Sequence, residues 1–304
     1  MNCKSITACA VFLMLTLCSV STEAAWDGPG TQSVDLKSPV QQGSKTTYFD
    51  LFRKVFPDLQ TDSTHDDAAI AHRSVPMRKI DDERESIVLE SDIELKSFDS
   101  RWIKSEGRRL LLLSAELSAE DANEGTPYEG EATVLAVFGL EPKIVFGLEP
   151  KIELLDVMDI KTDRFTAFWE EHPLVHLNPQ NDAFVVSSTH SNAGENYNDL
   201  ALMFVDDGRF KIISSFFLSN TQGCGATFTE SPYFRALPAV GRKYPKILVT
   251  VRLKKEGDAG ECDRRTHGYT RYYRAIYYWQ QAKARYETDS RQLGKLAKLN
   301  RERL

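Results

Sequence analysis

The stretch LALMFVDDGRFKIISSFF, Leu200–Phe217, has the pattern of a β-hairpin. Two apolar runs flank Asp206-Asp207-Gly208, and such a triplet suits the tight turn between antiparallel strands. WQQAKARYETD, residues 279–289, has the same form, with QAKA at its tip. Other short apolar or alternating runs are separated by turn residues: SIVLESDIELKSF, RRLLLLSAELS, EGEATVLAVF, KIELLDVMDI, DAFVVSSTHSNA, YPKILVTVRLKK and GYTRYYRAIYYWQQ. They predict a mostly β protein, with an antiparallel sandwich-like or partial-propeller body.

A short helix is predicted near each end of this β body. Residues 48–56 place apolar side chains at helical spacing, with Thr47 as the N-cap and Pro57 as the stop. Residues 290–304 are predicted to form a second amphipathic helix that begins after Ser290.

The N-terminus has the layout of a secretory signal peptide. A lysine precedes the uncharged run ITACAVFLMLTLCSV, and small residues follow it. The run is too short to span a bilayer, and no other stretch is long enough, so no transmembrane anchor is expected. We expect a signal peptide over 1–24, a flexible leader over 25–45, and one β-rich domain over 46–304, located in the periplasm or secreted.

Export to an oxidising compartment bears on the pairing of the cysteines. Three of the five are removed with the signal, which leaves Cys224 and Cys262 in the mature chain. Two cysteines in an oxidising compartment predict one disulfide. That bridge would close a loop of about forty residues and stabilise the fold by about 2–4 kcal/mol.

An octapeptide, VFGLEPKI, occurs twice in succession between Val137 and Ile152. With one copy removed, the region reads as strand, GLEP turn, strand. Solenoid repeats need longer periods and more copies. We therefore expect a tolerated local duplication, and deletion of Val145–Ile152 should leave folding and activity intact.

The charge is unevenly distributed. The chain carries a net charge of −6, but residues 264–304 hold 11 basic and 3 acidic side chains. The acidic total disfavours binding to nucleic acid. The basic end either contacts an anionic partner or folds against the acidic remainder of the chain.

The strand expected over residues 268–281 is the best candidate for a ligand site. On a strand, one face carries Tyr269, Arg271, Tyr273, Tyr277 and Trp279, and the other carries Tyr272, Arg274, Ile276 and Tyr278. We predict the first five as ligand-binding residues, because aromatic rings and arginines stack on sugars or bases. The alternative is that one face packs into the core and the other makes cross-strand pairs.

Catalytic chemistry has weaker support in the sequence. Gly-Cys224-Gly can belong to a thiol nucleophile, but the disulfide competes for the same sulfur. In EEHPLVH, residues 170–176, Pro173 disfavours the helix that a paired-histidine zinc site needs. No serine-hydrolase elbow and no phosphate-binding loop occurs, so we expect no cofactor, no metal and no catalytic residue.

The signal peptide together with YFDLFRKVFPDLQ, TQGCGATF, KYPKILVTVRLKK and LAKLNRERL resembles exported β-rich proteins of Gram-negative bacteria that have no assigned activity. YNDLALMFVDDGRFKII is similar to the strands of FG-GAP propeller blades, without their acidic metal motif. The resemblance carries no activity or site that could be transferred to this chain. We expect a non-catalytic envelope protein that binds a glycan or a protein. The alternative function is a cell-wall or polysaccharide hydrolase, or a thiol enzyme that uses Cys224.

Overall fold

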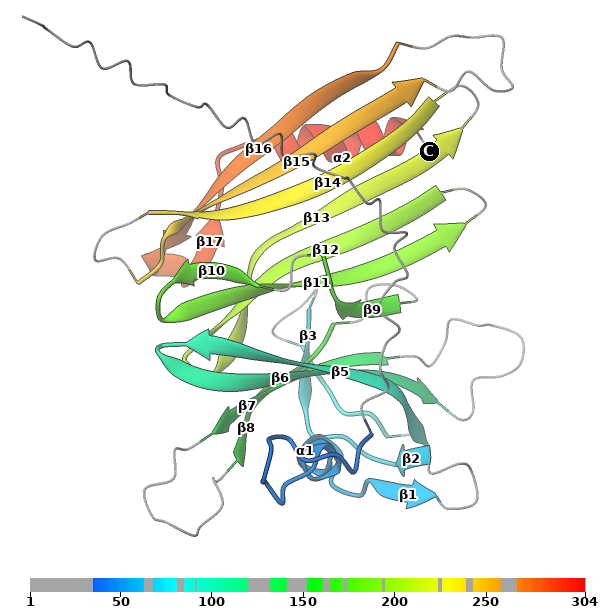
Figure 1. The fold of residues 1–304 in the computed structure, drawn as a ribbon, viewed down its shortest axis with the longest axis vertical. Helices are drawn as coiled ribbons and strands as arrows, with labels where there is room; N and C mark the ends of the chain where they lie inside the picture. Colours follow the sequence, from blue (N-terminus) through cyan, green and yellow to red (C-terminus); the bar gives the residue numbers. More distant parts are fainter. Residues whose placement is uncertain are drawn as a thin grey trace, which may run out of the picture. The chain divides into compact units, whose positions relative to one another are not determined.

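Two β-sheets and a short helix near each end make up the described part of the computed structural model (Figure 1). The described residues are 35–62, 68–80, 85–90, 92–119, 132–140, 152–160, 165–171, 174–192, 195–223, 226–238, 243–257 and 267–303. The prediction of a mostly β protein with short terminal helices is confirmed. The signal peptide, both mature cysteines and residues 141–151 of the octapeptide region lie outside the described residues.

The first sheet is largely antiparallel, with one parallel pair where β3 lies beside β8. Its strands, in spatial order, are β1 (Gln60–Asp62), β2 (Ala68–Ala71), β5 (Ile93–Ser105), β6 (Arg108–Ala119), β7 (Ala132–Leu140), β8 (Ile152–Asp159), β3 (Met77–Lys79) and β4 (Ser86–Ile87). The single strand expected over residues 86–98 is thus two strands, which lie in different parts of the sheet.

The second sheet is antiparallel throughout. Its order is β10 (Val175–Asn178), β11 (Asn181–Asn192), β12 (Glu195–Asp206), β13 (Arg209–Gly223), β14 (Ala226–Leu237), β15 (Lys246–Gly257), β16 (Tyr269–Gln280) and β17 (Arg285–Glu287), and β9 (Phe165–Phe168) also pairs with β11. Both predicted hairpins are confirmed. Asp207 and Gly208 turn β12 into β13 with positive φ angles. The 3-10 turn Gln281–Lys283 joins β16 to β17.

The two sheets share a core, and each has a second apolar face. Along β6, Leu111 and Leu113 pack toward α1 (Tyr48–Val55), while Leu110 and Leu112 pack toward the second sheet. This alternation follows from the two-residue period of a strand. The predicted α1 helix begins at the cap residue Thr47, whose side chain forms a capping box with Asp50.

The core begins before residue 46. Val40 is buried against the α1 side of the first sheet, and Pro39 forms a β-bridge with Thr47. Within residues 35–45, which the sequence predicts as part of a flexible leader, Val40 and Leu36 therefore contact the core, while most of the other side chains are exposed.

β13 and β14 pair over only three residues of each strand, Thr221–Gly223 with Ala226–Phe228, and then diverge. The helix α2 (Gln292–Arg303) contacts both β13 and β16, and its Leu296 is buried in the core of the second sheet. Proline 232 lies in β14 beyond the region that pairs with β13. Among the described strands, only β15 pairs with β14 at this position. The N–H that Pro232 lacks would face the side of β14 that has no strand partner, so the proline costs no ladder hydrogen bond.

A buried polar cluster fixes α2 against β14. The Glu230 carboxylate accepts hydrogen bonds from the Ser219 backbone N–H at 3.1 Å and from Asn300 Nδ2 at 2.9 Å, and it forms an ion pair with Arg303. Burial raises the pKa of Glu230, and these hydrogen bonds act in the opposite direction.

The described ends of the octapeptide duplication lie in two paired antiparallel strands. β7 holds the start of the first copy, β8 begins at the last residue of the second copy, and Leu140 pairs with Ile152.

Candidate functional site

β16 alternates between a core-facing side and an exposed side. Of the five residues predicted to bind ligand, Tyr277 is 9% exposed, and Tyr269, Tyr273 and Trp279 are partly buried against the core of the second sheet. Arg271 is exposed. A ligand-binding role for the five stays a prediction, but the open surface of this strand belongs to the opposite face.

That opposite face extends over three strands. In register, Ser231, Arg252 and Tyr272 form one row across β14, β15 and β16, and the next row begins at Tyr233 and ends at Arg274. We call this surface the outer face; its members with exposed or half-buried side chains are Ser231, Tyr233, Arg235, Lys246, Leu248, Thr250, Arg252, Lys254, Tyr272, Arg274, Ile276 and Tyr278. Tyr272, Ile276 and Tyr233 are 55%, 45% and 42% exposed, which is unusual for large apolar side chains.

Most cations of the outer face have no carboxylate partner in the part of the chain that the structure describes. Lys254 pairs with Glu256 at 2.7 Å, but among the described residues no carboxylate lies within ion-pair distance of Arg235, Lys246, Arg252 or Arg274. Of these four cations, Arg274 belongs to the basic C-terminal region, and the other three come from β14 and β15.

Two arginines of the outer face lie over tyrosine rings. The Arg252 guanidinium carbon is 5.7 Å from the Tyr233 ring centroid, and that of Arg274 is 5.6 Å from the Tyr272 centroid. Within the described structure, no acceptor reaches the buried Nε of Arg252. The face thus presents two Arg–Tyr pairs with positive charge beside aromatic surface, which suits an anionic partner that has planar or apolar parts.

Trp279, one of the five residues predicted to bind ligand, is packed among other aromatic rings. Its ring stacks on Tyr244 at 4.0 Å between centroids and packs edge-on against Phe204 and Tyr286. Next to this stack, Lys243 Nζ contacts Glu106 Oε1 at 2.7 Å and Asp206 Oδ1 at 3.0 Å, which ties the two sheets together. The hydrogen bond to Glu106 is the main reason why the pKa of Lys243 is raised.

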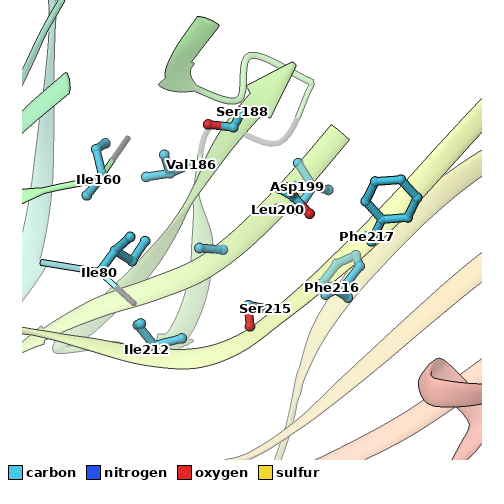
Figure 2. A pocket seen from close by; sticks show the side chains of 11 residues that line it. Ile80, Ile160, Val186, Ser188, Asp199, Leu200, Ile212, Ser215, Phe216 and Phe217 are labelled. Carbon is cyan, nitrogen blue, oxygen red and sulfur yellow. The ribbon is translucent and has the colours of Figure 1, made fainter. Parts of the chain in front are cut away.

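A cavity of about 340 Å³ is lined by residues of β11, β12 and β13 together with Ile80 and Ile160, which follow β3 and β8. Figure 2 shows isoleucines on one side of it and Phe216 and Phe217 on the other, with Ser188, Asp199 and Ser215 also in the lining. Its volume is at the lower end of the range for small-molecule sites. The cavity has room for a small apolar group, but no lysine or arginine of the described residues lines it, unlike the outer face.

The catalytic alternatives gain no support from the described residues. His176 Nδ1 is hydrogen-bonded to the buried Asp182 at 2.6 Å, and in the described part of the chain no hydroxyl bonds to its ring. His172, the other member of the predicted histidine pair, lies outside the described residues, and so does Cys224. No three His, Cys, Asp or Glu side chains of the described ranges gather as metal ligands.

The predicted disulfide partners are not described, but strand residues near them are. Ala226, two positions after Cys224, is the register partner of Gly257, which lies five positions before Cys262. The bridge stays a prediction.

No described helix has the length and apolar character needed to cross a membrane. Comparison of the chain with protein-family models, curated proteins and solved structures gives no match. The function must therefore be argued from the surface itself.

Proposed function

We propose that this protein is a non-catalytic binding protein of the bacterial envelope, exported to the periplasm or secreted, which holds an anionic partner on the outer face. The observation that carries the proposal is a group of four cations that have no carboxylate partner among the described residues, beside three tyrosines on one sheet surface; the cations are Arg235, Lys246, Arg252 and Arg274. A net charge of −6 makes so basic a surface unlike the chain as a whole.

Flat sheet surfaces with aromatic rings suit extended partners. Tyr233 and Tyr272 lie two strands and one pleat apart, which is roughly 12 Å from standard strand spacings. A polymer with regularly spaced acidic groups can meet both tyrosines and the arginines between them. Such contacts give salt-dependent binding and need no nucleophile, metal or cofactor.

Binding to a uronic-acid polymer tests the proposal. We expect polygalacturonate to bind the mature chain, with an affinity that falls as NaCl rises, and neutral dextran not to bind. The double variant R235Q/R274Q should bind roughly 2- to 30-fold more weakly, because each exposed ion pair contributes about 0.2–1 kcal/mol.

The matched control is R53Q/K54Q, which removes the same charge from the exposed side of α1. Equal weakening by both double variants, or no binding of any anionic polymer, would contradict the proposal. Polymer length is measured after incubation, since shortening of the polygalacturonate would favour the hydrolase alternative.

A further inference from the structure

We propose that the free edge of β16 takes up an extended acidic peptide as an additional strand of the second sheet. This inference rests on the proposed function, because the peptide would lie along the border of the outer face. It goes further by naming the partner as a polypeptide in strand conformation.

In the described structure the edge of β16 has no strand partner before Tyr278, and Ser290 occupies it at the Arg274 carbonyl. β15 pairs with Tyr269–Tyr277 on one side, whereas β17 pairs only with Tyr278, Trp279 and Gln280 on the other. Figure 1 draws β16 as the outermost long strand of its sheet. Among the described residues, no strand covers the edge beside Thr270–Tyr277.

One hydrogen bond shows which backbone groups face this edge. Ser290 Oγ donates to the Arg274 carbonyl at 2.8 Å, so that carbonyl points away from β15. In an antiparallel strand a residue turns its N–H and C=O to the same side, and alternate residues turn to opposite sides. The backbone groups of Thr270 and Tyr272 therefore also point to the open edge.

The side chains beside the edge set the charge of the partner. β16 has two arginines, Arg271 and Arg274, and no acidic residue, and Arg252 and Lys254 follow on β15. Two copies of β16 paired edge to edge would place arginines near arginines, and like charges on paired strands are destabilising. An acidic strand has the complementary charge and gains main-chain hydrogen bonds as well.

Alternation within the peptide follows from the two faces of the sheet. Beside Arg274 and Tyr272 the added strand meets the basic outer face, and on its other side it meets Tyr273, which is partly buried. A capped peptide of sequence EVEVEVE places acids on one face and valines on the other. We expect it to bind in a fluorescence anisotropy assay, and KVKVKVK not to bind.

Backbone methylation separates strand addition from simple charge attraction. Two versions of EVEVEVE carry N-methyl groups on the glutamates alone or on the valines alone. In an added strand only one of these sets faces β16, so one version should lose at least 10-fold in affinity relative to the other. If both versions bind as tightly as the parent peptide, the peptide does not add a strand to β16, and binding by charge to the outer face remains supported. If no version binds but polygalacturonate does, the inference is also wrong.

A proline in the edge gives an independent test. Tyr272→Pro removes an N–H that faces the free edge and leaves the ladder with β15 intact, which edge strands tolerate. It should bind EVEVEVE at least 10-fold more weakly than its control, Tyr272→Ala. Equal binding by the two variants would overturn the inference.

Hydrogen exchange identifies what covers the edge. The Tyr272 amide should exchange fast in the free chain and slow down when EVEVEVE is added. Protection in a chain that sedimentation shows to be monomeric would mean that another part of the chain already covers the edge. Protection in a dimer would make the occupant a second copy. Either result overturns the proposal.

Discussion

Deletion of one copy of the octapeptide should make the protein slightly more stable. Because the copies are identical, removing residues 141–148 gives the same chain as removing Val145–Ile152. All residues of β7 and β8 are thus retained, and Leu140 can still pair with the isoleucine that begins β8. The product joins the strands through Glu-Pro-Lys, a three-residue connection of a length common in hairpins.

The magnitude follows from the lengths of the connection. Residues 141–151 link the paired positions Leu140 and Ile152 in the full chain, and three residues link them after deletion. Loop-closure entropy scales as (3/2)RT ln n, so this shortening reduces the cost by about 1 kcal/mol. For a chain of this size, such a gain raises Tm by about 2–4 °C.

Thermal unfolding followed by circular dichroism measures this difference. The control replaces residues 141–148 with Gly and Ser at equal length, which keeps the connection long and should leave Tm unchanged. Binding of polygalacturonate should be the same in all three chains, since the outer face belongs to the other sheet. A loss of soluble protein, or a lower Tm in the deletion than in the Gly/Ser control, would show that the second copy contributes to the fold.

Four further outcomes are expected. Arg303→Met leaves the buried Glu230 carboxylate without its ion pair and should cost about 3–5 kcal/mol at pH 7 in urea unfolding, against little change for the exposed Arg301→Met. Burial raises the pKa of Glu230, so protonated Glu230 favours the folded state at low pH and this contribution is lost as the pH rises. A protonated Glu230 needs no ion pair, so the loss of unfolding free energy in Arg303→Met should be smaller at pH 5 than at pH 7. An equal loss at both pH values would contradict the assignment. Trp279→Ala should destabilise the fold by about 3–5 kcal/mol, a loss that a purely ligand-binding residue would not show. Ala201→Val should raise Tm, because the added methyl groups fill space in the cavity that Ala201 lines; a lower Tm would show that the lining has no room for them. The exported protein should have a mass lower by two hydrogens and should resist alkylation, whereas two labelled thiols would remove the Cys224–Cys262 bridge.

Local patterns in the sequence predicted the local elements well. The capping box at Thr47, the Asp-Asp-Gly turn and the turn after Gln280 each act within a few residues, so the sequence contains all that is needed to recognise them. β14 was not predicted, because Pro232 argues against a strand unless one knows that β13 diverges there. The parallel pairing of β3 with β8 joins residues about 80 positions apart, and no local pattern of apolar residues predicts which distant strands pair.

The sequence pointed to β16 as the candidate strand, but which of its faces is open to solvent could not be chosen from the sequence. Both faces of β16 carry tyrosines and one arginine each in the expected alternation, so composition does not distinguish them. The choice depends on α2 and on the apolar residues of β15, which cover the side of Tyr277. The alternation of Arg252 and Lys254 with buried Val251 and Leu253 in β15 could have indicated which face of the sheet is open and basic.

Where β13 and β14 diverge, α2 packs against the second sheet, and we expect this helix to complete the fold last. All strands of the described residues precede this helix in the sequence. Its Leu296 packs into the core of the second sheet, and Asn300 and Arg303 reach Glu230. A ribosome or a secretion pore releases the chain from its N-terminal end, so all strands emerge before the segment that closes the sheet. Until then the second sheet would remain a substrate for chaperones and proteases, and a chain truncated before Gln292 would stay in that state.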